Sequence, residues 1–338
     1  MKQLGVGIVG AGILGTMHAQ VYAGMPNARL LGVADINEPR AKELAAKYGT
    51  KAFVDYNEML KENEIEAVAV CTPDFAHRDP TVAAAEAGKH VLVEKPLSTT
   101  SSDGEDMLRA AKNAGVKLMV RFSNRWNPPF LKAKEALDGS QLGDLLYLYI
   151  RLNDTIFVPT KMLSWAGKST VAFFLMSHTF DLARWYAKSE AKTVFAISKS
   201  RVLSKMGINT PDFYAATVEF ESGAVANLES LWILPTSHPS VYDFKMEMVG
   251  SKGSVFVDTT ERCADVYDEQ HTRPDILGLV NIHGVNTGFV KESIAAFVDC
   301  VLNDKPVPAP GEDGLAVTRM LEAVESSCSS GEVVEVKH

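Results

Sequence analysis

The chain has 338 residues, of which 46% are hydrophobic and 22% charged, and its formal net charge is -8 at pH 7. This length exceeds what one hydrophobic core usually organises, so we expect two domains, and the composition excludes a disordered chain. The acidic balance and the absence of a Lys/Arg run argue against nucleic acid as a partner, and no stretch of about 18 apolar residues predicts a membrane-spanning helix.

Cysteine usage indicates the compartment. The four cysteines are Cys71, Cys263, Cys300 and Cys328. They lie far apart, without a CxxC pair or a Cys/His cluster, so we expect a reducing, cytoplasmic location and no metal site. The apolar segment 4–14 is interrupted by glycines and lacks a cleavage site, which predicts a buried strand and not a signal peptide.

From residue 1 to about 122, short apolar runs alternate with helical patterns. The expected strands are 5–9, 30–34, 67–71, 90–93 and 117–121, and the expected helices are 13–24, 38–48, 79–88 and 102–114. Strands that are apolar throughout are buried on both faces, as in a parallel sheet covered by helices. We therefore expect a doubly wound, Rossmann-type domain over residues 1–122.

The pattern changes after residues 124–129, so the second domain is expected over residues 123–338. The expected hairpins join 213–221 to 225–234 and 244–249 to 254–257, and the expected helices are 129–138, 171–187, 288–303 and 313–328. We expect a mostly antiparallel sheet with these helices on one face and the other face open. An open sheet face usually finds a partner, which predicts a homodimer or homotetramer formed through this sheet.

A GxGxxG motif directly follows the first strand and opens the first helix, which is the context that makes such a motif specific. Gly10 permits the tight turn, Gly12 lets the backbone approach a pyrophosphate, and Gly15 allows close packing of helix and strand. The helix begins with Ile13 and Leu14, whose N–H groups can bind the phosphates. The motif predicts a dinucleotide site.

The second strand ends with an acidic residue, Asp35, twenty residues beyond Gly15. A carboxylate there accepts hydrogen bonds from both ribose hydroxyls and repels a 2'-phosphate, so we predict NAD as the cofactor. Ile36 stands where an NADP-binding chain would more comfortably place a basic or small polar residue, but Arg40, one turn further on, leaves use of NADP open. The structural alternative is that Asp35 only caps the helix that starts near Pro39.

Two strand-end segments, Cys-Thr-Pro-Asp-Phe-Ala-His at 71–77 and Glu-Lys-Pro at 94–96, resemble the glucose-fructose oxidoreductase and inositol dehydrogenase (Gfo/Idh/MocA) family when they are read with the glycine motif. The resemblance covers essentially the whole chain, including 124–126, 178–185 and 311–331. It implies an NAD-dependent dehydrogenase acting on CH–OH groups. Such an enzyme would transfer a hydride between nicotinamide and a hydroxyl or carbonyl carbon of a sugar, inositol or glycoside.

The Glu-Lys-Pro triplet is the most specific part of the resemblance, which implies that Lys95 is catalytic. A lysine at the carboxyl edge of a parallel sheet can also donate a hydrogen bond to the reacting oxygen, as the fold itself suggests. The alternative is that Glu94 and Lys95 form a solvated ion pair. The resemblance adds to the cofactor site Cys71, Thr72, Pro73, His77, Glu94 and Lys95. His77 is also readable as a plain helix-start residue.

In the second domain, helical spacing places four side chains on one face of the helix expected over 171–187. They are Phe174, His178, Asp181 and Trp185. On its own, such an inward stripe favours a structural histidine. The resemblance implies instead that His178 transfers the proton and that Asp181 is structural.

The chain departs from the inositol dehydrogenase pattern at Phe174, where relatives of that type usually carry an aspartate that helps to bind the substrate. An aromatic ring at this place can stack on an apolar or glycosidic part of a ligand. This shifts the expected substrate from plain inositol towards a sugar derivative or glycoside.

Other polar residues, interleaved with tryptophan, suit a polyhydroxylated ring, and each is also readable as structural. These substrate candidates are Asn124, Arg125, Trp126, Asn153, Asp154, Trp165 and Lys168. Two other functions stay open. One is a non-catalytic NAD-binding sensor or corepressor, because a fold can keep its cofactor and lose its chemistry. The other is a reductase of an imine, an enone or a non-sugar diol.

Overall fold

The computed structural model describes residues 2–260, 264–269 and 271–338, so Cys263 lies outside the described residues. The chain forms two compact units. The first, which we call the Rossmann unit, comprises Met1–Ser123 and Leu279–Leu315, and the second, the sheet unit, comprises Asn124–Gly278 and Ala316–His338. The sequence analysis divides the chain once, near residue 122, whereas the chain returns to the Rossmann unit for residues 279–315.

The Rossmann unit is built on a six-stranded parallel sheet of order β3-β2-β1-β4-β5-β6. Its strands are β1 (Leu4–Val9), β2 (Ala28–Ala34), β3 (Lys51–Phe53), β4 (Ala67–Val70), β5 (His90–Val93) and β6 (Leu118–Val120). Every residue of β1 and β4 is buried, as continuous apolar runs require in a sheet covered on both faces. The predicted doubly wound sheet is confirmed, and the short edge strand β3 is an addition to it.

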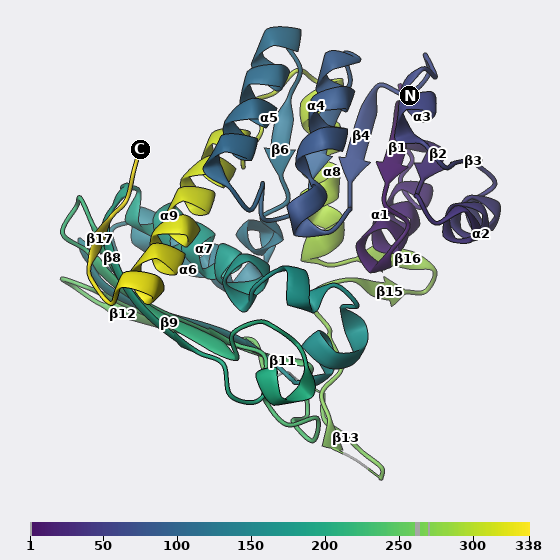
Figure 1. Ribbon diagram of the computed structural model, residues 1–338. Coiled ribbons are helices and arrows are strands. Elements are labelled where there is room, and N and C mark those ends of the chain that lie inside the picture. The colour runs from purple at the N-terminus through teal and green to yellow at the C-terminus, as the bar shows by residue number, and fades with distance from the viewer. Residues whose placement is uncertain (1, 261–263, 270) are drawn as a thin grey trace. The chain divides into compact units, whose positions relative to one another are not determined.

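Helices cover both faces of this sheet (Figure 1). They are α1 (Ile13–Ala23), α2 (Glu38–Tyr48), α3 (Tyr56–Leu60), α4 (Arg78–Glu86), α5 (Ser101–Ala114) and α8 (Phe289–Leu302). Helices α4 and α5 pack against each other, whereas α8 packs on α1, β1 and β5. A small hairpin, β15 (Val280–Ile282) with β16 (Val285–Thr287), precedes α8.

Helix α8 corrects one expectation. The sequence analysis assigned the helix expected over 288–303 to the second sheet, but its buried side chains, among them Ile294 and Phe297, belong to the Rossmann unit. The reason is physical: an apolar stripe shows that a helix covers a surface but does not specify which one.

The sheet unit contains a seven-stranded sheet of order β12-β11-β7-β10-β9-β8-β17. Its strands are β7 (Leu145–Asp154), β8 (Ala191–Lys199), β9 (Phe213–Phe220), β10 (Val225–Leu231), β11 (Tyr242–Gly250), β12 (Ser254–Asp258) and β17 (Val334–Glu335). Only β10 and β7 pair in parallel among the described strands of this sheet, so the expected mostly antiparallel sheet is confirmed. Both predicted hairpins are present, and a further one joins β13 (Val266–Tyr267) to β14 (His271–Thr272).

Helices pack on one face of this sheet. They are α6 (Pro128–Asp138), α7 (Ser177–Ala187), which follows a π-helical turn at Ala172–Met176, and α9 (Gly311–Ser330). Helix α7 contacts β7 and β10, and Ser327 of α9 accepts a hydrogen bond from Ala196 N of β8. Residues alternate along the strands, so the opposite face carries exposed side chains such as Phe195, Ile197 and Phe256.

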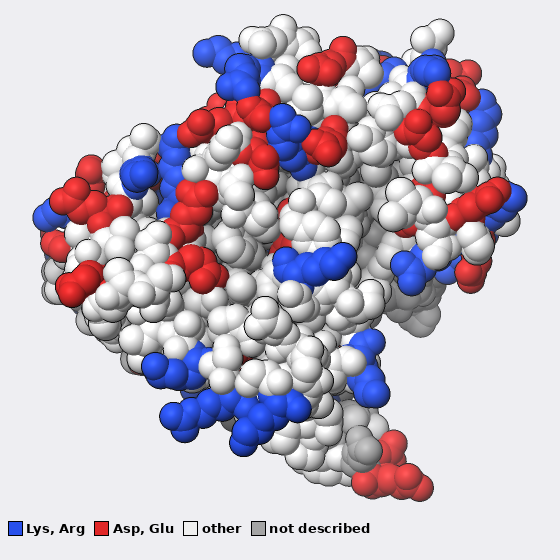
Figure 2. Space-filling view, in the orientation of Figure 1, with Lys and Arg blue, Asp and Glu red and all other residues white. Residues whose placement is uncertain are grey.

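On the face that Figure 2 shows, acidic and basic side chains are interspersed over α4 and α5, where Arg78 pairs with Asp79 and Asp106. Among the residues that the structure describes, no helix is both long and apolar enough to cross a membrane.

Replacing Phe297 by alanine tests the place of α8, because its fully buried ring packs within the Rossmann unit. We expect a loss of about 3–5 kcal/mol in unfolding free energy, measured by urea denaturation. The control Lys291→Ala, at a more exposed position of the same helix, should change stability by less than about 0.5 kcal/mol. Equal effects of the two substitutions would contradict the assignment.

Candidate active site

The glycine motif forms a tight turn between β1 and α1. Gly10 has a positive φ of 99°, and a Cβ added there would lie 2.7 Å from the Cys71 carbonyl oxygen. A Cβ on Gly15 would lie 1.8 Å from the Gly10 oxygen, so helix and strand approach as closely as glycine allows. A Cβ on Gly12 would meet no atom of the described residues within 4 Å. This side of the loop is therefore open to a ligand, while the other two glycines are fixed by the fold.

Asp35 faces this loop from the end of β2. Its Oδ2 accepts a hydrogen bond from Ala11 N at 2.7 Å, and its Oδ1 accepts one from Asn37 N at 2.7 Å. The N-cap of α2 is Asn37, whose Oδ1 accepts from Arg40 N at 3.1 Å. The alternative that Asp35 merely caps this helix is therefore wrong, and the carboxylate is oriented towards the glycine loop.

The surroundings of Asp35 fit a dinucleotide. Ile36 is 93% exposed and Ile13 is 61% exposed, so apolar surface lies open on both the Asp35 segment and the first turn of α1. No side chain caps the N-terminus of α1, where Ile13 and Leu14 begin the helix, so the backbone there suits phosphate. Arg40 is exposed.

The strand-end segments after β4 and β5 meet through His77. Its Nε2 lies 3.0 Å from the Thr72 carbonyl oxygen and its Nδ1 lies 2.8 Å from the Pro96 carbonyl oxygen. The Thr72 hydroxyl donates to the Ala76 carbonyl oxygen, and Pro73 precedes a short 3-10 turn. Each ring nitrogen of His77 therefore lies within hydrogen-bond distance of a backbone carbonyl, one in each of the two segments.

Lys95 directly follows Glu94 at the end of β5, and only 8% of it is exposed. The Glu94 carboxylate is 1% exposed and binds Arg121 and His18. The alternative of a solvated Glu94–Lys95 pair is therefore wrong, because both residues are buried. Arg121 was not among the predicted site residues.

His18, Cys71 and Glu94 place their ligand-type atoms within 4.8 Å of one another. The Arg121 guanidinium binds both carboxylate oxygens of Glu94, through Nε to Oε1 and through Nη2 to Oε2 at 3.1 Å. A cation beside a guanidinium would be repelled, so this cluster does not suit a metal ion.

In the sheet unit, His178 lies at the start of α7. Its Nδ1 is 3.2 Å from Asn124 Nδ2, and Asn127 Nδ2 donates to Asn124 Oδ1 at 3.3 Å. As placed, Asn124 donates from Nδ2 to an unprotonated Nδ1, and if Asn124 and Asn127 both turned over, Asn124 Oδ1 would accept from a protonated Nδ1. Asn124 therefore orients the ring whichever nitrogen carries the proton.

Arg125 forms a buried ion pair with Asp181, from Nη2 to Oδ1 at 2.5 Å, and its guanidinium also lies 6.0 Å from the centre of the Trp185 ring. The pair joins the segment before α6 to α7. These contacts give Asp181 the structural part that the resemblance implies. Trp126 is half-buried.

Phe174, in the π-helical turn before α7, lies in an aromatic cluster. Its ring centre is 6.0 Å from that of Trp165, in an edge-to-face arrangement, and 6.3 Å from that of Trp232. Trp232 is fully buried and donates from Nε1 to the Pro211 carbonyl oxygen. Trp232 was not among the predicted site residues, although a tryptophan near the end of an expected strand is a usable signal.

Asn153 has a structural place at the end of β7. Its Nδ2 donates to Glu229 Oε1 at 2.8 Å and its Oδ1 accepts from Leu231 N at 3.0 Å, so the amide joins β7 to β10. Asp154 is buried, and Lys168 is exposed in the loop after Trp165.

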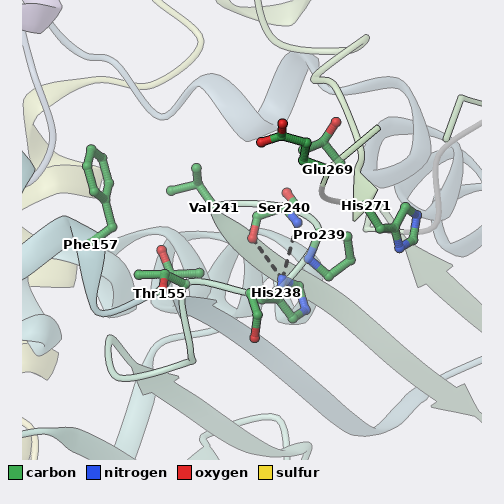
Figure 3. Close-up of a pocket in the computed structure, with 11 residues that line it drawn as sticks. Thr155, Phe157, His238, Pro239, Ser240, Val241, Glu269 and His271 are labelled. Atoms are coloured by element: carbon green, nitrogen blue, oxygen red, sulfur yellow. Dashed lines mark hydrogen bonds between the residues drawn. The ribbon is translucent and has the colours of Figure 1, made fainter. Parts of the chain in front are cut away.

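A pocket of about 610 Å³ opens in the sheet unit (Figure 3). Its wall includes Thr155, Phe157, His238 and Ser240, and the His238 ring binds the Ser240 backbone at its edge. None of the residues predicted for cofactor or substrate lines it. Thr155 of its wall directly follows the substrate candidate Asp154 in the sequence.

A glycine turn that is open to a phosphate, beside a carboxylate placed to bind ribose hydroxyls, is the arrangement of a dinucleotide-binding protein. Residues 4–122 match the model of an oxidoreductase family with an NAD-binding Rossmann fold, and residues 134–336 match the family's C-terminal alpha/beta domain. The chain therefore belongs to this oxidoreductase family, as the resemblance implied, and its Rossmann unit carries the family's NAD-binding domain.

Named relatives act on polyols and sugars. A myo-inositol 2-dehydrogenase of Thermotoga maritima is 30% identical, with 91% of each chain covered. A levoglucosan dehydrogenase of Pseudarthrobacter phenanthrenivorans is 28% identical, covering 75% of this chain and 73% of that protein. The solved scyllo-inositol dehydrogenase of Lactobacillus casei, with NAD(H) and scyllo-inositol bound, is 25% identical with a TM-score of 0.84 and covers 99% of each chain.

Two glycine substitutions should separate cofactor binding from folding. Gly12→Ala meets no protein atom, so it should leave the melting temperature unchanged while its methyl group weakens NADH binding at least about tenfold, measured by fluorescence titration. Gly15→Ala collides with the Gly10 carbonyl and should destabilise the protein itself. Full NADH affinity in Gly12→Ala would place the dinucleotide elsewhere.

Proposed function

We propose that the protein is an NAD-dependent dehydrogenase that oxidises a CH–OH group of a sugar derivative or glycoside. The observation that carries this is the place of Lys95, buried at the carboxyl edge of the same parallel sheet whose β1–α1 turn leaves Gly12 open. Ligands of doubly wound folds lie at this edge. The nicotinamide supplies the hydride acceptor.

Lys95 would donate a hydrogen bond to the substrate oxygen and stabilise the negative charge that develops on it when its proton leaves. His178 would take that proton, since imidazole is the side chain that changes charge near neutral pH. Asn124 binds His178 Nδ1 and would therefore keep Nε2, the nitrogen that takes the proton, pointing away from Asn124 in both protonation states of the ring.

Phe174 supports the choice of substrate class. With Trp165 and Trp232 beside it, this position offers an apolar surface where inositol dehydrogenases usually have a carboxylate. Sugars bind aromatic rings through their C–H faces. The levoglucosan relative acts on an anhydro sugar, in keeping with this class.

We further propose that the chain works in the cytoplasm as a homodimer or homotetramer joined through the open sheet face. Phe195, Ile197 and Phe256 are 42%, 48% and 70% exposed on that face, which is much apolar surface to leave in water. Cys71, Cys300 and Cys328 are free thiols, as a reducing compartment maintains.

Turnover should depend on both proposed catalytic residues. With NAD and a panel of inositols, sugars and glycosides, we expect NADH formation that Lys95→Ala and His178→Ala each lower by at least about 10³-fold. NADH binding by the variants should persist. Phe174→Asp should favour inositols over glycosides.

NADH binding without turnover across the panel, imines and non-sugar diols included, would support the non-catalytic sensor instead. Turnover confined to imines, enones or non-sugar diols would support the reductase.

Charging the open sheet face should lower the oligomeric state. We expect Ile197→Lys with Phe256→Lys to give a smaller species in analytical ultracentrifugation, because each introduces a charge on an apolar contact surface. Lys132→Ala, which removes an exposed charge on α6 on the helix-covered side of the sheet, is the control and should leave the oligomeric state unchanged. A wild-type monomer would contradict the proposal.

A further inference from the structure

Lys95 lies in the sequence between two residues that each form hydrogen bonds with buried side chains. Glu94, before it, binds through its side chain, and Pro96, after it, binds through its carbonyl oxygen. The two attachments lie in the Rossmann unit and involve different elements.

The attachment at Glu94 joins three elements. Val93 of β5 pairs with Val120 of β6, so Glu94 and Arg121 follow at the same level of neighbouring strands. Arg121 binds the carboxylate through Nε and Nη2, and Arg121 N donates to the Val93 carbonyl oxygen at 2.8 Å. His18, from α1, lies 2.8 Å from Oε1 through Nε2. Glu94 therefore has a single, fully determined position.

The charge state of this cluster follows from burial. Burial alone would raise the pKa of Glu94, but the charge of Arg121 and the His18 hydrogen bond outweigh it and hold the pKa well below its usual range. Burial lowers the pKa of His18, so its ring is neutral at pH 7 and donates one N–H to the carboxylate. The cluster is an ionised pair with a neutral donor.

The attachment at Pro96 is made by His77. A carbonyl oxygen only accepts hydrogen bonds, so a neutral ring can donate to one of its two carbonyl neighbours at a time. Burial lowers the pKa of His77, against the charge of Asp74 and the two carbonyls, and the shorter contact, 2.8 Å, is to Pro96. His77 therefore fixes the backbone on the far side of Lys95.

We propose that Arg121, His18 and His77 are positioning residues that hold Lys95 in its working place. The inference rests on the proposed catalytic role of Lys95. Because His18 belongs to α1, the helix that the glycine turn opens, Glu94 also ties the cofactor helix to the lysine segment. A displacement of a catalytic group by about 1 Å can lower the reaction rate about 10²-fold. Contacts that fix the position of Lys95 would therefore contribute to the rate.

Plain stabilisation is the competing explanation, and energetics separates the two. Removing one partner of a buried ion pair leaves an uncompensated charge and destabilises, whereas removing both charges together is often neutral. Arg121→Met alone should therefore lower the melting temperature, and Glu94→Gln with Arg121→Met should recover most of it. The double variant still lacks the bidentate attachment of Glu94.

The double variant is the decisive test. If the attachment positions Lys95, its kcat should stay about 10- to 100-fold below wild type despite the recovered stability, with NADH affinity changed less than about threefold. His77→Leu should show the same division between kcat and NADH affinity. Wild-type kcat in a stable double variant would overturn the proposal.

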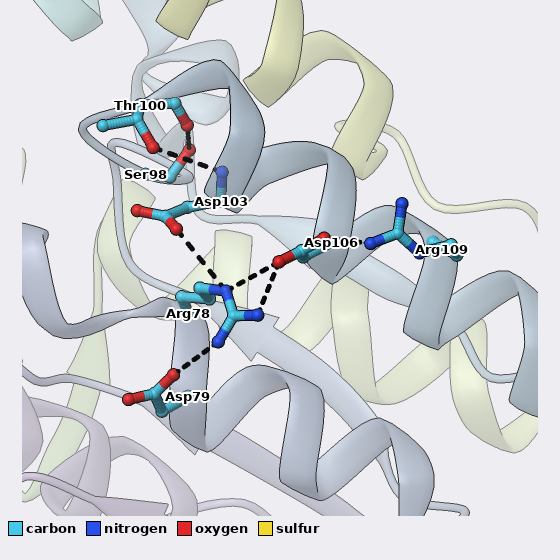
Figure 4. A network of polar contacts seen from close by, with 7 residues as sticks. All are labelled: Arg78, Asp79, Ser98, Thr100, Asp103, Asp106 and Arg109. Atoms are coloured by element: carbon cyan, nitrogen blue, oxygen red, sulfur yellow. Dashed lines mark hydrogen bonds and ion pairs between the residues drawn. The ribbon is translucent and has the colours of Figure 1, made fainter.

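Hydrogen exchange of the peptide 90–100, followed by mass spectrometry, gives a readout that needs no substrate. We expect faster exchange there in the double variant than in wild type. The control is Arg109→Met, which removes an exposed ion pair with Asp106 within α5 of the same unit (Figure 4). It should leave both kcat and exchange of this peptide unchanged, and unchanged exchange in the double variant would also overturn the proposal.

The two proposals fail in distinguishable ways. If Lys95→Ala keeps full turnover, the catalytic role of Lys95 is wrong whatever the exchange shows. If Lys95→Ala is inactive while the double variant is as active and as protected as wild type, only the positioning role is wrong.

Discussion

The buried carboxylate of Glu94 is the point on which the Rossmann unit's ligand edge depends. It is 1% exposed, and it is bound by His18 of α1 and by Arg121, which follows β6. A buried ion pair stabilises a fold little compared with apolar side chains of similar volume, because desolvation of two charges offsets their attraction. What distinguishes such an ion pair is its geometry, because a guanidinium and a carboxylate form two parallel hydrogen bonds in one relative orientation.

Much of the fold could be predicted because its signals are local. Apolar runs such as Leu4–Val9 and Ala67–Val70 are buried along their whole length, and the glycine spacing needs only the adjacent strand and helix for its interpretation. Strand β3 was not predicted, because its three residues, Lys51–Phe53, are exposed or half-exposed and form neither an apolar run nor an alternation of apolar and polar residues. The assignment of α8 to the Rossmann unit was not predicted, because the order of elements in the sequence does not specify which sheet an apolar helix covers.

The placement of candidate site residues could be predicted where it follows from strand position, and could not be predicted where side-chain contacts decide it. Lys95 and Asp35 follow strands directly, so the parallel sheet places them. Asn153 also ends a strand, but its amide is engaged with Glu229 and Leu231 N, which no sequence pattern shows. Arg121 could have been found: it ends β6 as Glu94 ends β5, and parallel neighbours ending in opposite charges indicate a buried pair.

In the proposed mechanism, each unit contributes the groups that its own scaffold can fix. A parallel sheet converges its strand ends on one edge, so the Rossmann unit holds backbone amides, a carboxylate and a lysine in fixed places. The sheet unit presents side chains from a helix start, where a π-helical turn precedes His178 and carries Phe174. One extra residue in such a turn changes the angular spacing of the side chains around it. If Phe174 selects the substrate as proposed, substrate class can change at this position while Asn124 and the Arg125–Asp181 pair keep His178 in place, so that selection of the substrate would be separate from the proposed proton transfer.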